Sequence, residues 1–182
     1  MRRIVTRLIA VLFVAAMTAP LIAQKTTALR TGGGGSPHVR TEWTIDGASI
    51  AVEYGRPYLK GRKEADMMPN GVPWRTGADA VTTITANKPL KFGGVSLPAG
   101  THTINTIPGD QQWQLLLGKL EGPNQWGIPY VKALELGRVP MKLAKTASSV
   151  EQVTISIDDT AAGATLRIEW GTRSATVPFT VG

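Results

Sequence analysis

The chain has 182 residues, 20 basic and 13 acidic residues, a formal net charge of +7 and no cysteine. Without cysteine, disulfides, thiol catalysis, cysteine-ligated metals and lipid attachment through a cysteine are excluded. The basic residues are scattered along most of the chain, so the positive charge does not predict a nucleic-acid partner, which needs clustered Lys and Arg.

The amino terminus has the pattern of a secretory signal peptide. Three arginines precede the apolar run Leu8–Met17, and Ala23 offers a small residue at the cleavage position. The run ends near Thr18 and Pro20, short of the roughly 20 apolar residues of a membrane span. We therefore expect a signal peptide over residues 1–23, export to the periplasm or the medium, and no membrane span after cleavage. The remaining 159 residues carry a net charge of +4 and are enough for one domain.

The segment after the expected cleavage site is rich in glycine and poor in apolar residues. Residues 24–37 (QKTTALRTGGGGSP) show no hydrophobic periodicity and contain four consecutive glycines. A phosphate-binding loop would need a preceding strand and a Gly-Lys-Ser/Thr sequence opening a helix, and neither is found. The segment is predicted to be a disordered leader, which places a single domain over residues 38–182.

The domain is dominated by short segments in which apolar and polar residues alternate. Residues 39–45 and 50–54 flank Asp46-Gly47, a typical β-hairpin signal. Helical turns are expected only at residues 63–68 and 124–130. Further strands are predicted over residues 80–86, 89–92, 95–97, 101–107, 113–117, 152–158, 165–170 and 175–181. This pattern predicts an all-β fold, a single antiparallel β-sandwich of jelly-roll or immunoglobulin-like topology, with little helix.

Five tryptophans divide into two groups in this pattern. Trp43, Trp113 and Trp170 fall on the apolar side of their strands and are expected in the core, together with Ile155 and Ile168. The other two, Trp74 and Trp126, lie in predicted loops. They are the candidates for stacking on a sugar ring.

One stretch, residues 54–79, interrupts the strands and is much longer than an ordinary connection. It combines basic and aromatic residues, and Arg binds carboxylate, phosphate or sulfate through two parallel hydrogen bonds. The candidate ligand-binding residues are Arg56, Lys60, Arg62, Trp74, Arg75 and Asp79. A structural role is equally consistent with the sequence, because arginines can bond loop carbonyls or carboxylates. The constrained backbone beside Pro73 favours Arg75 as such a clamp, with Arg56 or Arg62 facing a ligand.

Several motifs resemble a family of secreted bacterial proteins, domain of unknown function 2911. They are Tyr54-Gly55-Arg56-Pro57 with Lys60-Gly61-Arg62, then Val72-Pro73-Trp74-Arg75-Thr76-Gly77-Ala78, then Leu97-Pro98-Ala99-Gly100-Thr101 and Thr106-Ile107-Pro108-Gly109. The resemblance extends from about residue 38 to the end and implies an exported, β-rich domain. It implies no activity, cofactor or ligand. The family typically continues with an Asn and an acidic residue, whereas Asp79 and Ala80 stand here.

The sequence contains no recognisable catalytic or metal-binding motif. His38 and His102 are the only histidines and do not have metal-ligand spacing, so no metal or other cofactor is expected. The adjacent methionines 67 and 68 are interpreted as core residues. Glu53, Glu64, Asp66 and Asp79 could supply a carboxylate pair for glycoside hydrolysis, although no spacing singles out a pair.

Two functional hypotheses remain open from the sequence. The first is a cell-envelope binding or structural module that holds an anionic or glycan ligand at residues 54–79. The alternative is a secreted hydrolase that uses a carboxylate pair or His102 near the same loop. The sequence favours a protein without enzymatic activity and leaves its oligomeric state open.

Overall fold

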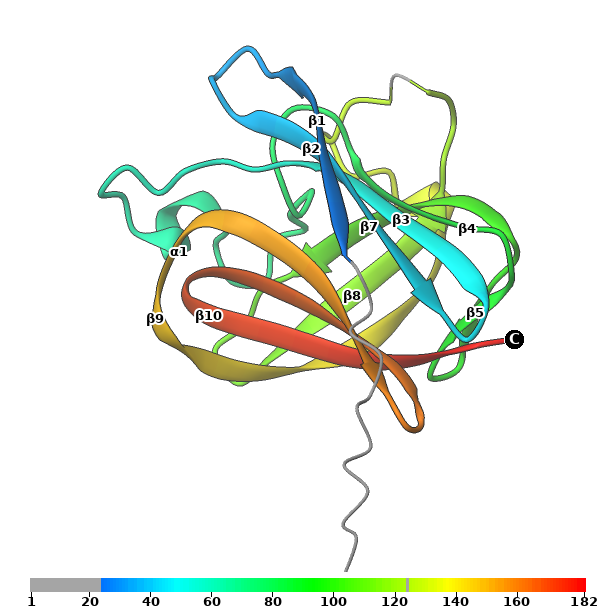
Figure 1. Ribbon diagram of the computed structural model, residues 1–182. Coiled ribbons are helices and arrows are strands. Elements are labelled where there is room, and N and C mark those ends of the chain that lie inside the picture. Colours follow the sequence, from blue (N-terminus) through cyan, green and yellow to red (C-terminus); the bar gives the residue numbers. More distant parts are fainter. Residues whose placement is uncertain (1–23, 124) are drawn as a thin grey trace, which may run out of the picture.

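The computed structural model describes residues 24–123 and 125–182, so the expected signal peptide lies outside the described residues. The chain forms one antiparallel sheet in the order β1-β2-β3-β4-β7-β8-β9-β10-β5-β6 (Figure 1). The strands are β1 (Lys25–Thr31), β2 (Pro37–Ile45), β3 (Ala48–Gly55), β4 (Thr82–Ala86), β5 (Leu90–Phe92), β6 (Val95–Leu97), β7 (Gly100–Ile107), β8 (Gln112–Lys119), β9 (Glu135–Thr160) and β10 (Gly163–Val181). The described helices are α1 (Glu64–Met67) and the 3-10 helix η1 (Lys132–Leu134). Neither of them is long or apolar enough to cross a membrane.

The predicted all-β antiparallel class is confirmed, and the sheet folds over a single core. Strand β2 contacts both β9 and β10, although neither is its neighbour in the strand order. Apolar residues from β2 through β10 form one hydrophobic cluster between these parts of the sheet. This arrangement is compatible with the predicted sandwich.

The β2–β3 hairpin forms where the alternation and the Asp-Gly sequence predicted it. Ile45 pairs with Ala48, and the two turn residues between them have positive φ angles, 48° at Asp46 and 70° at Gly47. Such a two-residue turn matches the right-handed twist of the flanking strands. The hairpin therefore places Val39, Thr41 and Trp43 on the buried face of β2.

The three tryptophans expected in the core are buried, as are Ile155 and Ile168. These two isoleucines are register partners in the β9–β10 pair. Because the side-chain period of a strand is two, their burial confirms the predicted faces of both strands. Phe92 and Phe179, in the same cluster, stack with their ring centres 4.8 Å apart.

The long β9–β10 ribbon differs from the separate short strands that the sequence predicted. The expected last strand, residues 175–181, is the continuation of β10. The register of the β9–β10 pair shifts around Gly171. Gly171 has a φ of 59°, a conformation that is unfavourable for most residues with a side chain. The first half of β9 was not predicted. It contains Pro140, which is unfavourable inside a sheet, yet Val139 and Met141 are buried against the core.

The prediction of a disordered leader is wrong for residues 25–31, which form the edge strand β1. This strand pairs with β2, and Thr26 Oγ1 lies 3.2 Å from Thr41 Oγ1. The glycines close the hairpin, with the Gly32 amide donating to Ser36 O at 2.8 Å. Every residue of β1 is exposed, so backbone hydrogen bonds to β2 hold the strand in place. Because β1 buries no face, its sequence has no hydrophobic alternation from which a strand could be predicted.

The predicted helical turn at residues 63–68 is confirmed by α1, but the second expected turn falls elsewhere. The described residues of 124–130 contain no helix, and η1 begins only at Lys132. Tyr130 and Arg138 both donate to the carboxylate of Glu135, Arg138 through two hydrogen bonds of 2.6 and 2.7 Å. These contacts fasten the 125–134 segment to the start of β9.

The Arg138 hydrogen bonds, supported by Tyr130, lower the pKa of Glu135 to about 2. A carboxyl group whose pKa is depressed on folding stabilises the protein above its unfolded pKa of about 4.3 and loses that effect as the pH falls toward the folded value. We therefore expect Glu135→Gln to lower the urea midpoint at pH 7 and to converge on wild type between pH 4.5 and 2. A difference that stayed constant over this range would contradict the assignment.

Candidate functional site

The first part of the 54–79 segment is bound to strand β9. The Leu59 amide donates to Glu151 O at 2.8 Å, and the Val153 amide donates to Pro57 O at 3.2 Å. Arg56 Nε donates to Val153 O and its second terminal nitrogen to Thr154 Oγ1, both at 3.0 Å. Arg56 therefore clamps this segment to β9, the structural role that the sequence also allowed for these arginines.

The Lys60-Gly61 sequence forms a tight turn stabilised by Arg62. Both central residues have positive φ angles, 49° and 74°, and the Arg62 amide donates to Leu59 O. The Arg62 side chain donates from Nε to the same oxygen at 2.9 Å and to Tyr58 O at 2.6 Å. Lys60 is exposed, with its ammonium 5.8 Å from the Tyr58 ring centre.

Trp74 belongs to the core and is not an exposed stacking platform, contrary to expectation. Its ring stacks on Trp170 with centres 5.7 Å apart and meets Trp113 edge-on at 6.2 Å. Its backbone exchanges two hydrogen bonds with Thr106. Contacts between aromatic rings stabilise the core by more than the burial of apolar area alone, and Trp74 is only 9% exposed.

The residues after Trp74 fold into a buried polar junction. Thr76, with φ of 58°, places its hydroxyl 3.1 Å from Thr106 Oγ1. Asp79 also has a positive φ, 61°, a conformation in which Asp and Asn are enriched. Its carboxylate accepts a hydrogen bond of 2.9 Å from Nε2 of His38, whose side chain is 5% exposed.

Three glycines make room for the His38–Asp79 contact. A Cβ atom at Gly32 would overlap the Asp79 carboxylate, and one at Gly55 would overlap the carbonyl of Ala78. A Cβ at Gly77 would come within 2.8 Å of Gly55 O. The β1–β2 turn, the end of β3 and the 77–79 segment can therefore approach closely only because these positions lack side chains.

A groove of about 370 Å³, which we call the arginine groove, lies beside this junction. Four of the six predicted ligand-binding residues line it, whereas Arg56 and Lys60 do not. Its wall also includes Ile128, from a distant loop, which no sequence pattern connects to this segment. The predicted residues in the groove are Arg62, Trp74, Arg75 and Asp79.

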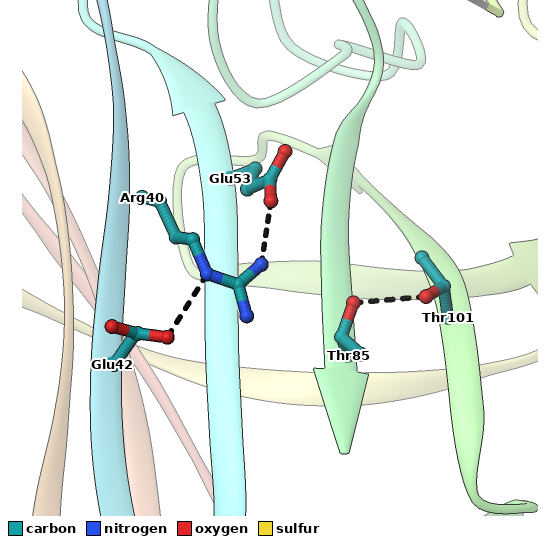
Figure 2. A network of polar contacts seen from close by, with 5 residues as sticks. All are labelled: Arg40, Glu42, Glu53, Thr85 and Thr101. Atoms are coloured by element: carbon teal, nitrogen blue, oxygen red, sulfur yellow. Dashed lines mark hydrogen bonds and ion pairs between the residues drawn. The ribbon is translucent and has the colours of Figure 1, made fainter. Parts of the chain in front are cut away.

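A larger groove of about 720 Å³, the sheet groove, lies over the outer face of strands β2, β3, β4 and β7. Arg40 donates to Glu42 at 3.0 Å and to Glu53 at 2.5 Å, and Thr85 Oγ1 lies 2.9 Å from Thr101 Oγ1 (Figure 2). The hydrogen bond that Arg40 donates to Glu53, and then the one that it donates to Glu42, raise the pKa of Arg40. The lining of the sheet groove includes His38, Arg40, Glu53, Thr85, Thr101 and Trp126.

Trp126 is 54% exposed and stands between the two grooves on a fixed backbone. It forms a β-bridge with Ala80, and the adjacent Gly127 amide donates to Asp79 O at 3.1 Å. The Arg75 guanidinium lies 5.9 Å from its ring centre and donates to Asp79 O at 3.3 Å. The expected exposure of Trp126 is confirmed.

The groups considered for hydrolysis do not converge in the described part of the chain. Glu53 lines the sheet groove and Asp79 the arginine groove, whereas Glu64 accepts hydrogen bonds from Thr172. His102 Nε2 lies 2.8 Å from Pro98 O. No group of three or more His, Asp or Glu residues suited to a metal ion occurs among residues 24–123 and 125–182.

Comparison with protein families confirms the resemblance seen in the sequence. The family model described as "Protein of unknown function (DUF2911)" matches residues 36–179. The chain belongs to this family. Searches of curated proteins and of solved structures gave no significant match.

In this DUF2911 protein, the two most specific motifs meet in space. Gly55 and Arg56 from the first lie against Gly77 and β9, and Gly77 belongs to the second. The motif glycines and Arg56 therefore serve the scaffold. The sequence analysis placed His38 at the edge of a leader and did not predict its hydrogen bond with Asp79. The two residues are 41 positions apart, and no sequence motif connects them.

Replacement of Arg56 and of Arg75 by Lys should distinguish the arginine that clamps the scaffold from the arginine that faces the arginine groove. Arg56→Lys loses the forked contact with Val153 O and Thr154, which should cost about 1–3 kcal/mol and lower the melting temperature by several degrees. Arg75→Lys loses one long hydrogen bond and the contact with Trp126, so its cost should stay below about 1 kcal/mol.

Thermal melts of both variants beside wild type measure this difference. Arg167→Lys, which alters an exposed ion pair with Asp158, serves as the control for the substitution itself. A larger loss of stability in Arg75→Lys than in Arg56→Lys would reverse the two assignments.

Proposed function

We propose that this protein is an exported binding module of the cell envelope that holds an anionic group in the arginine groove. The observation that carries the proposal is that Arg62 and Arg75 line one groove while neither has a carboxylate within 4 Å in the described part of the chain. A guanidinium offers five N–H donors, of which Arg75 uses one and Arg62 two within the protein. Donors on both side chains therefore remain for a ligand.

The charge balance of the groove supports an anion over a neutral ligand. The acidic group at its wall, Asp79, accepts a hydrogen bond from His38. The backbone on either side of Arg75 is fixed by the Trp74–Thr106 hydrogen bonds and by the Thr76 hydroxyl. Pre-ordered arginines bind carboxylate, phosphate or sulfate with little further loss of entropy.

The burial of Trp74 removes the argument for sugar stacking at this position, so the proposal is restricted to the anionic group. The hydrolase alternative gains no support, because no two of its four candidate carboxylates line the same groove among the described residues. Retaining or inverting hydrolysis needs two carboxyl groups about 5–10 Å apart across one cleft.

Binding of paired probes by the purified protein tests the proposal. Trigalacturonate carries carboxylates that its trimethyl ester lacks, and inorganic phosphate and sulfate provide the other two anion types. We expect at least one anion to bind by calorimetry and the ester not to bind. Arg62→Gln and Arg75→Gln should each weaken binding about tenfold or more, since a hydrogen bond to a charged group contributes about 1.5–3 kcal/mol.

Arg167→Gln is the matched control, because it removes the same charge from the exposed side of β10 outside both grooves. Melting curves confirm that each variant is folded. Failure of all three anions to bind, or equal weakening by Arg167→Gln, would overturn the proposal.

Export is the second part of the proposal and rests on the amino-terminal pattern. Three arginines, an apolar run and Ala23 are the features that a signal peptidase pathway reads. We expect protein recovered from the periplasm or the medium to begin at Gln24 when its amino terminus is sequenced. A membrane-held chain that retains Met1 would contradict export by a cleaved signal.

A further inference from the structure

We propose that the sheet groove is a second binding site, distinct from the arginine groove, and that it takes the hydroxyl groups of an uncharged carbohydrate. The site lies on the outer face of the sheet, where Arg40, Glu53, Thr85 and Thr101 form the floor and Trp126 stands at one side. The proposal does not depend on anion binding at Arg62 and Arg75.

The floor offers hydrogen-bond donors and acceptors in a fixed arrangement. Figure 2 shows Arg40 reaching between Glu42 and Glu53, which hold its guanidinium through Nε and one terminal nitrogen. The other terminal nitrogen and the second oxygen of Glu53 make no hydrogen bond among the described residues. Neighbouring hydroxyl groups on a sugar ring can donate to a carboxylate and accept from a guanidinium, which is the pair presented here.

The threonine pair extends this polar floor across β4 and β7. Thr85 and Thr101 hydroxyls lie 2.9 Å apart, so one donates to the other and both keep acceptor lone pairs (Figure 2). Both side chains line the sheet groove. A ligand rich in hydroxyl donors would satisfy these acceptors, whereas an anion, which has only acceptors, would not.

Trp126 provides the apolar part of the site. Its ring is 54% exposed, and its backbone is held by the bridge to Ala80 and the hydrogen bonds on either side of it, Val81 to Gln125 and Gly127 to Asp79. A rigid, exposed aromatic ring beside polar groups is suited to the apolar face of a sugar. Such an aromatic anchor at the side of a groove binds with little loss of side-chain entropy.

The size and charge of the sheet groove distinguish it from the arginine groove. Its volume of about 720 Å³ lies within the range of about 300–1,000 Å³ that small-molecule sites occupy. Its central arginine is engaged by two carboxylates, whereas neither arginine of the other groove has a carboxylate partner in the described residues. Arg30, at the β1 side of the sheet groove, has no carboxylate within 4 Å among the described residues, so the contrast with the arginine groove applies to the floor around Arg40.

Calorimetry with neutral hexasaccharides tests this site in the purified protein. The probes are cellohexaose, chitohexaose, maltohexaose and laminarihexaose, which share hydroxyl-rich pyranose rings and differ in linkage or substituents. We expect at least one to bind. Trp126→Ala should weaken that binding about tenfold or more, and Thr85→Val with Thr101→Val about three- to tenfold, since the change removes hydroxyls at nearly constant shape.

Two controls separate this site from its surroundings. Thr44→Val makes the same substitution at an exposed position of β2 outside the sheet groove, and should leave binding unchanged. Arg62→Gln alters the arginine groove without touching Trp126, and should also leave binding of the neutral sugar unchanged. A protein that binds sugars but no anion would contradict the proposed function alone.

The inference on the sheet groove would be overturned by any of three results. These are no binding of all four hexasaccharides, wild-type affinity in Trp126→Ala and the double threonine variant, or equal weakening by Thr44→Val or Arg62→Gln. Melting curves of each variant establish that a loss of binding is not a loss of folding.

Discussion

The partly buried contact between His38 and Asp79 joins the β1–β2 hairpin to a segment 41 residues further along the chain, and its two residues line both grooves. The contact links the start of β2 to the segment that follows Trp74, and the turn between β1 and β2 packs on it through Gly32. Asp79 lines one groove and His38 the other, so the pair is part of the wall between them. A side chain at Gly32, Gly55 or Gly77 would force these segments apart, and the partly buried Asp79 carboxylate would then lose the hydrogen bond from His38.

Arg56 and Arg75 look equivalent in the sequence but have different roles, because they lie at different places relative to this wall. Arg56 lies where the chain leaves β3 and runs along β9, so backbone and hydroxyl oxygens of β9 surround its guanidinium. Arg75 lies beyond the His38–Asp79 junction, where its guanidinium donates one hydrogen bond among the described residues, to Asp79 O, and lies beside the ring of Trp126. Position relative to the strands, rather than residue type, decides how many donors each guanidinium uses within the protein, two for Arg56 and one for Arg75.

The sequence predicted the parts of the fold in which one face of a strand is buried. Alternation identified the β2–β3 hairpin and the faces of Ile155 and Ile168, because burial imposes the period of two. It could not identify β1, which buries nothing, or the first half of β9, where Pro140 argues against a strand. At the site, chemistry and loop length pointed to Arg62, Arg75 and Asp79. Composition could not show that Trp74 fills the space between Trp113 and Trp170, or that Ile128 lies beside Arg75.

Many residues of the motifs that carry the family resemblance have structural roles. Gly55 and Gly77 allow the backbone segments to approach closely, and Arg56 and Thr76 make internal hydrogen bonds. The fold needs these four residues whatever ligand it binds, and also if it binds none. Of the side chains that differ between the two grooves, Trp126, Ile128 and Thr85 lie outside these motifs, whereas Thr101 is the last residue of the Leu97–Thr101 motif. A rigid β scaffold can position a site whose chemistry is set by a few side chains, and the motif glycines and Arg56 belong to that scaffold. The candidate ligand-selecting side chains lie partly in the motifs, at Arg62, Arg75 and Thr101, and partly outside them, at Thr85 and in the loop at residues 125–128.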